Sequence, residues 1–365
     1  MTTPPPKRLV FIVAGALDQP TGGYRYDARI IAGLRAAGWH IDTHMLDGHF
    51  PCPDETAHAA LDAALAACAD GAAVVIDGLA CGGLPEVIEH HAARLTIIVL
   101  VHHPLCDETG LDRNAAERLA NSERRVLACA KRVIVTSVHT RDRLQALKMT
   151  ACPADVVEPG VDTRDVQGAL VRPRDRAGLP WRLLCVATLI PRKGHDVLID
   201  ALAQMTDLDW HCDLVGPLDR NPAHARHIEQ TIARENLAER ITLHGALDAA
   251  QLDACYAAAD VFVLASHYEG YGMVITEAIA AGLPVVTTTG GALVDTLPAG
   301  AGYSVTPGDA AAFAQALRRL MTDPTRYSTT CAAVLQARHA LPGWGDATHA
   351  FAAALETPST VGRRP

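Results

Sequence analysis

Apolar and polar positions alternate along the chain in blocks that predict two series of buried strands and helices. Short runs rich in Val, Ile and Leu have the length of strands, and the Ala/Leu-rich segments between them have helical periodicity. The strands predicted in the first series are 9–14, 40–46, 73–77, 95–101, 133–136 and 155–157. Helices are predicted over 24–37, which Gly38 ends, and over 112–130. Continuous apolar strands indicate parallel sheets covered on both faces.

A second series follows the polar stretch 163–178, which we interpret as a linker because it has few apolar positions. The strands predicted in this series are 182–188, 210–215, 241–243, 261–265 and 284–288. The pattern predicts an α/β protein with two Rossmann-like, doubly wound parallel-sheet domains, 1–165 and 178–342, facing a cleft. A C-terminal helix within 343–358 is expected to cross back to the first domain.

The amino-acid composition supports this fold class and argues against one class of function, general nucleic-acid binding. A length of 365 residues is enough for two domains with separate cores. The apolar residues are mostly aliphatic, with only 5 Phe, 7 Tyr and 4 Trp, which disfavours an all-β sandwich. A formal net charge of −9 argues against general nucleic-acid binding, which requires a basic surface.

The cysteines and the N-terminal apolar run indicate a protein of the cytoplasm. None of the ten cysteines forms a Cys-x-x-Cys pair, so we expect buried, reduced thiols rather than a zinc ribbon or a disulfide framework. The run 9–17 ends at Asp18 and is shorter than the ~20 residues that a membrane-spanning helix needs. We therefore expect a soluble, cytoplasmic protein without a secretion signal.

One region is locally basic. Residues 111–150 contain nine Lys and Arg against four Asp and Glu, a local net charge of +5. A basic helix there is a candidate for peripheral contact with the inner face of an anionic membrane. The alternative is an ordinary solvated helix face.

A strand followed by a glycine-containing loop and a helix start is the most informative motif. The strand 261–265 leads through Gly270 and Gly272 to a helix near Met273, and a helix start of this kind suits an anion such as a diphosphate. Glu269 and Glu277 are eight residues apart, so their backbones would lie roughly 12 Å apart at helical rise. Paired glycosidase carboxylates are only about 5–9.5 Å apart. Two carboxylates that hold different parts of one ligand fit better; solvated glutamates are the alternative.

Two further turns carry weaker signals. Arg192 and Lys193 lie between a strand and a helix, where they can neutralise a phosphate, although a surface charge pair would have the same sequence. Gly22 and Gly23 follow the first strand but do not form a dinucleotide fingerprint, and the chain has no P-loop. No His-Glu-x-x-His or comparable ligand set occurs, so no metal site is expected.

Taken together, these motifs resemble the retaining GT-B glycosyltransferases of family 4. The region 237–309 resembles the donor half of that family through Ser-His-Tyr-Glu-Gly-Tyr-Gly at 266–272, Glu-Ala-Ile-Ala-Ala-Gly-Leu-Pro at 277–284, Gly-Gly at 290–291 and Pro-Gly-Asp at 307–309. The motifs at 22–23, 159–162 and 192–194 follow the order that the resemblance requires.

The resemblance implies roles for individual residues. Glu277 would bind the ribose hydroxyls of a nucleotide sugar and Glu269 its sugar, while Arg192 and Lys193 would neutralise the diphosphate. His102 would point at the sugar, with His103 as a substitute. The implied donor-binding residues are Gly22, Gly23, Arg192, Lys193, Gly270, Tyr271, Gly272, Met273, Glu277 and His103; the implied catalytic residues are Glu269, Arg192, Lys193 and His102.

The resemblance also implies an activity. It implies transfer of a sugar from a nucleotide sugar, with retention, without a protein nucleophile, metal or cofactor, to a saccharide, lipid-linked or small-molecule acceptor. Thr188 stands where the family commonly has an Arg, so Arg192 would supply that charge. Two alternatives remain open: a nucleotide-sugar-binding protein with weak or no catalysis, and a GT-B nucleotide-sugar epimerase.

Overall fold

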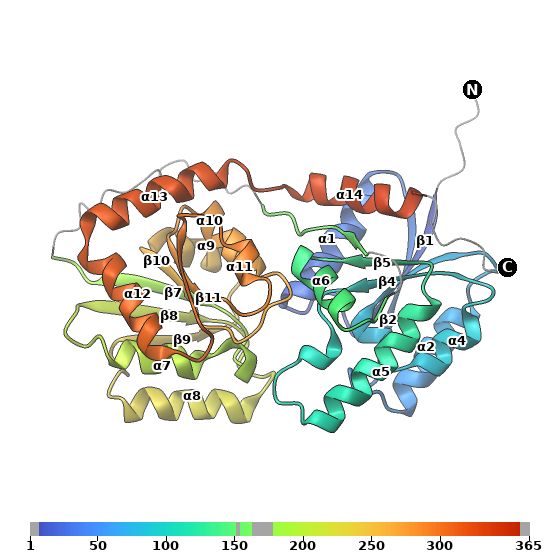
Figure 1. The fold of residues 1–365 in the computed structure, drawn as a ribbon, viewed down its shortest axis with the longest axis horizontal. Helices are drawn as coiled ribbons and strands as arrows, with labels where there is room; N and C mark the ends of the chain where they lie inside the picture. The colour runs from blue at the N-terminus through green and yellow to red at the C-terminus, as the bar shows by residue number, and fades with distance from the viewer. Residues whose placement is uncertain (1–6, 151–153, 163–177, 358–365) are drawn as a thin grey trace. The chain divides into compact units, whose positions relative to one another are not determined.

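A computed structural model describes residues 7–150, 154–162 and 178–357 of the chain (Figure 1). The chain divides into two compact units. The first unit comprises Met1–Gly160 and Pro342–Pro365, and the second comprises Val161–Leu341. Of the linker interpreted at 163–178, only Gly178 lies within the described residues.

The first unit is built on a six-stranded parallel sheet in the order β2-β1-β3-β4-β5-β6. Its strands are β1 (Arg8–Ala14), β2 (His40–Leu46), β3 (Ala73–Asp77), β4 (Thr96–Val101), β5 (Arg132–Val135) and β6 (Asp155–Val156). Its helices are α1 (Gly22–Ala36), α2 (Glu55–Ala66), α3 (Gly78–Cys81), α4 (Pro85–His91), η1 (Leu105–Asp107), α5 (Arg113–Cys129), α6 (Val138–Ala146) and α14 (Trp344–Glu356). Although α14 is the last helix of the chain, it packs on α1 (Figure 1).

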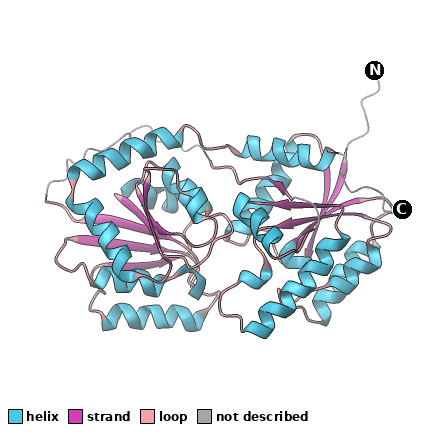
Figure 2. Cartoon of the chain, in the orientation of Figure 1, coloured by secondary structure: helices cyan, strands magenta, loops and turns pink. Residues whose placement is uncertain are grey.

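The second unit has a six-stranded parallel sheet in the order β12-β11-β10-β7-β8-β9. Its strands are β7 (Trp181–Val186), β8 (Trp210–Val215), β9 (Ile241–Gly245), β10 (Val261–Leu264), β11 (Val285–Thr288) and β12 (Gly302–Val305). Its helices are η2 (Pro191–Lys193), α7 (His195–Ala203), α8 (Pro222–Arg234), α9 (Ala249–Ala258), α10 (Met273–Ala280), α11 (Leu293–Thr296), α12 (Ala310–Thr322) and α13 (Pro324–Arg338). In each unit, helices surround the strands of the sheet (Figure 2).

The strand order reverses once in each sheet. In the first unit β1 lies between β2 and β3, and in the second β7 lies between β8 and β10. Helices cover such sheets on both faces, which buries the inner strands. Every residue of β10 and β11 is buried. In sheets of this kind, ligands bind beyond the carboxyl ends of the strands at the reversal. The residues after β1 and β3, and after β7 and β10, are therefore the places to search for a site.

Most predicted strands agree with the structure to within two residues, and the fold class is confirmed. The prediction missed β12, a four-residue edge strand that is not fully buried anywhere and so carries little apolar signal. It also began the first helix at residue 24, whereas α1 begins at Gly22, which places both glycines of the pair in the first turn.

The expectation that the thiols are buried is wrong in part. The nine cysteines within the described residues are free of disulfide bonds. Cys52, however, is exposed, and four others are only half-buried. Among the helices of the described ranges, none has the length and apolarity to cross a bilayer.

Candidate functional site

The strand reversal of the second unit brings together Arg192, Lys193 and Glu269. Arg192 and Lys193 lie on η2 after β7, and Glu269 lies in the loop after β10. The two loops are joined at the backbone, because the N–H of His267 donates to the carbonyl of Arg192 at 2.8 Å. Gly194 allows the close approach: its backbone has φ 62°, and a Cβ there would lie 2.1 Å from the carbonyl oxygen of Ala265.

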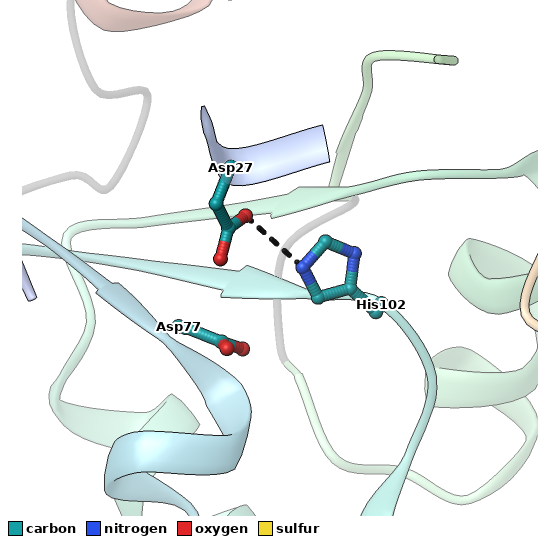
Figure 3. Close-up of side chains that lie close together, drawn as sticks. All are labelled: Asp27, Asp77 and His102. Carbon is teal, nitrogen blue, oxygen red and sulfur yellow. Dashed lines mark hydrogen bonds and ion pairs between the residues drawn. The ribbon is translucent and has the colours of Figure 1, made fainter. Parts of the chain in front are cut away.

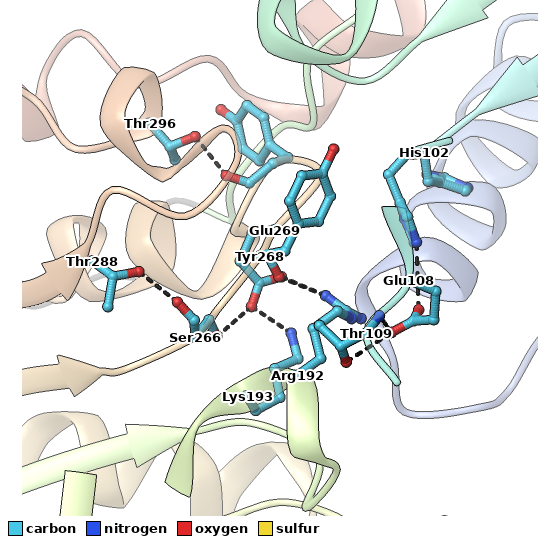
Figure 4. Close-up of polar contacts among 12 residues, drawn as sticks. His102, Glu108, Thr109, Arg192, Lys193, Ser266, Tyr268, Glu269, Thr288 and Thr296 are labelled. Carbon is cyan, nitrogen blue, oxygen red and sulfur yellow. Dashed lines mark hydrogen bonds and ion pairs between the residues drawn. The ribbon is translucent and has the colours of Figure 1, made fainter. Parts of the chain in front are cut away.

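The Glu269 carboxylate is buried at the centre of this cluster (Figure 4). Its Oε1 accepts from Lys193 Nζ at 2.6 Å and from Ser266 Oγ at 2.7 Å, and its Oε2 lies 3.4 Å from Arg192 Nη1. Burial raises the pKa of Glu269, but the charges of Lys193 and Arg192 and these hydrogen bonds outweigh it, so the net shift is downward. Glu269 is therefore an ionised carboxylate between two cations.

A glycine pair holds the Glu269 loop in place. The N–H of Glu269 donates to the Gly290 carbonyl at 3.3 Å, and the Glu269 carbonyl accepts from the N–H of Ala292 at 2.9 Å. A Cβ at Gly291 would lie 2.2 Å from the carbonyl oxygen of Glu269, and one at Gly290 would lie 2.4 Å from that of His267. Only glycine lets the two backbones pack this closely.

The loop then enters α10 through Gly272. Gly272 is the N-cap residue with φ 91°, and a Cβ there would lie 2.6 Å from Leu293 Cδ2. Because glycine has no side chain, the first N–H groups of α10 are not capped by the N-cap residue, which suits an anion. Thr296 Oγ1 donates to the Tyr271 carbonyl at 2.5 Å, and Met273 is buried.

Glu277 lies on α10 and is buried, with its carboxylate directed to a different partner. Tyr256, on α9, donates its hydroxyl to Glu277 Oε2 at 3.0 Å. The two glutamates thus have separate partners. The sequence motif Tyr-Ala-Ala-Ala-Asp at 256–260 is part of the family resemblance, but Tyr256 was not predicted as a site residue.

In the first unit, the strand reversal gathers His102, Asp27 and Asp77 (Figure 3). His102 follows β4, Asp77 ends β3, and Asp27 lies on α1 after β1. His102 Nε2 is 3.1 Å from Asp27 Oδ1. Gly23 packs against the same imidazole, since a Cβ at Gly23 would lie 3.3 Å from His102 Cδ2.

The two aspartates were not predicted as site residues. One ligand atom from each of Asp27, Asp77 and His102 lies within 4.8 Å of the other two. A search by spacing cannot find this cluster because its members are separated by 50 and 25 residues along the chain (77 − 27 and 102 − 77).

His103 points to a different partner from His102. His103 Nε2 is 3.5 Å from Glu108 Oε2. Gly22 begins α1, and Tyr24 in its first turn donates its hydroxyl to the Ala14 carbonyl. The predicted site residues of this unit therefore all lie beyond the carboxyl ends of β1 and β4.

The basic region of α5 is partly neutralised within the protein. Arg125 pairs with Glu86 and Glu89 at 2.8 and 2.7 Å, and Arg113 pairs with Glu117 at 2.8 Å. Contact between this region and a membrane stays a prediction.

Solved structures of other proteins have a fold similar to that of this chain. Sucrose-phosphate synthase from Thermosynechococcus elongatus superposes with a TM-score of 0.77 at 22% identity, over 96% of this chain and 98% of the other. HepE from Anabaena in complex with UDP and glucose superposes with a TM-score of 0.72 at 18% identity, over 95% of this chain and 99% of HepE. The fold is GT-B.

Within this GT-B fold, residues 180–323 match the family described as glycosyl transferases group 1. The matched range contains Arg192, Lys193, Glu269 and Glu277.

Two sequence relatives agree with the group 1 match. The chain is 32% identical over 274 residues to D-inositol 3-phosphate glycosyltransferase 1 of Catenulispora acidiphila, covering 70% of this chain and 64% of the relative. It is 31% identical over 248 residues to a GDP-mannose-dependent alpha-(1-6)-phosphatidylinositol monomannoside mannosyltransferase of Mycolicibacterium smegmatis, covering 64% of this chain and 61% of the relative. The matches thus span less than two thirds of the length of either relative.

Proposed function

We propose that this protein transfers a sugar from a nucleotide-sugar donor to a hydroxyl group of an acceptor. The proposal rests on one observation above all: the buried Glu269 is paired with the half-buried Lys193 and Arg192 at the strand reversal of the group 1 region. A carboxylate beside two cations suits a donor that has both hydroxyl groups and a diphosphate.

The cluster suggests how the donor is held. In the structure both cations are paired with Glu269. A diphosphate carries more negative charge than one carboxylate, so it would attract Lys193 and Arg192 and leave the Glu269 oxygens to accept from sugar hydroxyls. The first N–H groups of α10, beyond Gly272, offer donors to the same anion.

The proposed chemical role of these groups is electrostatic. As the bond to the sugar breaks, negative charge grows on the leaving diphosphate, and fixed cations and helix-end N–H groups stabilise that charge. We propose transfer with retention of the anomeric configuration and without a metal ion or cofactor. The acceptor proton would pass to the departing phosphate.

Glu277 is proposed to bind the ribose of the donor. Tyr256 holds its Oε2, which orients the carboxylate on α10. Two hydroxyls of a ribose can donate to one carboxylate, so loss of the charge should weaken nucleotide binding.

The test is a panel of labelled UDP-, GDP-, ADP- and dTDP-sugars with candidate acceptors. GDP-mannose and D-inositol 3-phosphate are included because the names of two relatives mention mannose transfer and inositol 3-phosphate. We expect transfer from at least one donor that continues in EDTA, and a product of unchanged anomeric configuration by NMR. Glu277→Gln should weaken binding of that donor at least about tenfold, the loss of one charged hydrogen bond.

The matched control is Glu229→Gln, which makes the same charge change on the exposed face of α8 and should not alter donor binding. Binding without turnover would favour a nucleotide-sugar-binding protein. Change of the donor sugar without any acceptor would favour an epimerase. Unchanged donor affinity in Glu277→Gln would remove the ribose assignment.

A further inference from the structure

A cluster of two buried aspartates and one half-buried histidine lies at the strand reversal of the first unit (Figure 3). Asp27 is fully buried and Asp77 is 4% exposed. The two carboxylates come from α1 and from the end of β3, and they approach one imidazole, that of His102. Burying two carboxylates is costly unless a positive charge accompanies them.

The orientation of His102 is determined on several sides. Asp27 Oδ1 contacts Nε2, and the hydroxyls of Thr136 and Thr140 each donate to the His102 backbone carbonyl at 3.2 Å. The Tyr26 ring meets the imidazole edge-on, with centroids 5.4 Å apart. Because the backbone and one ring nitrogen are both held, the direction of the other nitrogen, Nδ1, is determined as well.

Nδ1 lies on the edge of the ring away from both aspartates (Figure 3). Within the part of the chain that the structure describes, it has no hydrogen-bond partner, and the His102 side chain is 19% exposed. An imidazole with one nitrogen on a buried carboxylate and the other accessible is arranged to act on a ligand.

The charges around His102 decide what it offers to that ligand. The titratable groups that face it are Asp27, Asp77 and Tyr26, with His103 next in the chain and close enough to influence Asp77. Burial lowers the pKa of His102, but the charge and hydrogen bond of Asp27 and the charge of Asp77 outweigh it and raise the pKa to about 9. Burial and the charge of Asp27 raise the pKa of Asp77 to about 6.

We propose that Asp27 and Asp77 are positioning residues that keep His102 in its doubly protonated form, so that Nδ1–H donates a hydrogen bond to an oxygen atom of the bound substrate. This inference rests on the proposed transferase function. In this role His102 is a cationic donor to oxygen and not a general base that removes the acceptor proton.

The first test does not depend on activity. The full-length protein is labelled with ¹⁵N-histidine, the His102 signals are assigned by their loss in His102→Gln, and the ring is titrated by NMR. We expect both nitrogens to stay protonated up to about pH 8. In Asp27→Asn the pKa of His102 should fall by roughly 1–3 units, the usual effect of one opposite charge at this range. Asp77→Asn should lower it less.

A matched control uses another His–Asp pair of the same unit. Asp62 Oδ1 lies 2.8 Å from Nε2 of the buried His91, so Asp62→Asn should perturb His91 and leave the His102 titration unchanged. A neutral His102 at pH 7 in the wild type would overturn the proposal, and for this measurement His102→Gln serves only to assign the signals. Displacement of the His102 proton by added Zn²⁺ or Mn²⁺ would also overturn it, in favour of a metal site.

The second test uses the pH profile of kcat/KM for sugar transfer. A protonated donor is lost as the pH rises through its pKa, so the wild-type rate should fall only above about pH 9, and in Asp27→Asn the fall should begin 1–3 units lower. A rate that instead rises as His102 loses its proton would identify a general base and overturn the proposal. If no donor is turned over at all, the transferase function fails while the NMR result still stands.

Discussion

At Gly194 a single atom decides whether the Arg192–Lys193 turn can form. The residue combines φ 62° with a site where a Cβ would lie 2.1 Å from the Ala265 carbonyl oxygen. The left-handed conformation alone costs a non-glycine residue about 1–2 kcal/mol. The carbonyl oxygen belongs to the backbone after β10 and cannot turn away as a side chain would. Gly194 therefore sets the distance between η2 and the Glu269 loop.

We predict that Gly194→Ala destabilises the protein by more than the ~1–2 kcal/mol of backbone strain, and that it weakens donor binding because Lys193 and Arg192 move away from Glu269. The control is Gly38→Ala, at φ 89° with no atom within 4 Å of its Cβ, which should show the strain alone. Urea denaturation and nucleotide titration of both variants measure the two effects. Equal losses of stability in the two variants would show that the Ala265 contact is unimportant.

At the scale of elements, α1 and α14 pack closely against each other in the first unit. A Cβ at Gly33 would lie 2.1 Å from Thr348 Oγ1, and the rings of Tyr26 and Trp344 meet at 6.1 Å. The Phe11 ring of β1 lies 6.5 Å from Phe351. The C-terminal helix thus belongs to the core of the first unit, although most of the chain separates it from α1.

A double-mutant cycle tests this contact. Gly33→Ala should improve helix propensity by about 1 kcal/mol but lose about 1–3 kcal/mol to overpacking against Thr348. In a Thr348→Ala background the two nearest atoms are gone, so the same change should cost at least about 1 kcal/mol less. The cycle is read from the free energies of unfolding of the four proteins. Additive effects would show that α14 does not pack on Gly33 in solution.

At the scale of the whole molecule, one buried acid couples stability to pH. Glu123 on α5 is 1% exposed, and its Oε2 accepts from the N–H of Leu105 at 3.0 Å. Burial raises the pKa of Glu123 from its ordinary value of 4.5 to about 8, against the opposing effect of the Leu105 hydrogen bond. Between pH 4.5 and about pH 8, the folded protein keeps a proton on Glu123 that the unfolded chain has released. This group therefore lowers the free energy of unfolding as the pH rises.

We predict that Glu123→Gln removes this dependence, because an amide is uncharged at every pH and still accepts from Leu105. The stability of the wild type relative to the variant should fall by up to about 1.4 kcal/mol per pH unit between pH 5 and 8. Urea denaturation at several pH values measures the difference. The control is Glu117→Gln, at an exposed position of the same helix. The free energy of unfolding of this variant should change with pH as that of the wild type does. A constant difference for Glu123→Gln would mean that the carboxyl is ionised throughout.

Much of the fold and part of the site followed from local patterns. Continuous apolar runs predicted the central strands because residues buried on both faces must be apolar at every position. Gly272 marked the approach to a helix start, and the structure gives this residue φ 91°. The edge strand β12 was not predicted, because a short strand with one neighbouring strand needs few apolar residues.

The partners of the charged groups were decided by the tertiary structure alone. Asp27, Asp77 and His102 meet because parallel strands carry distant segments to the same sheet edge, and Tyr256 reaches Glu277 from another helix. The periodicity of a chain reports which face of an element is buried, because burial selects apolar side chains one position at a time. It does not report which buried polar group faces which, since that pairing arises only when the sheet order brings separate segments together.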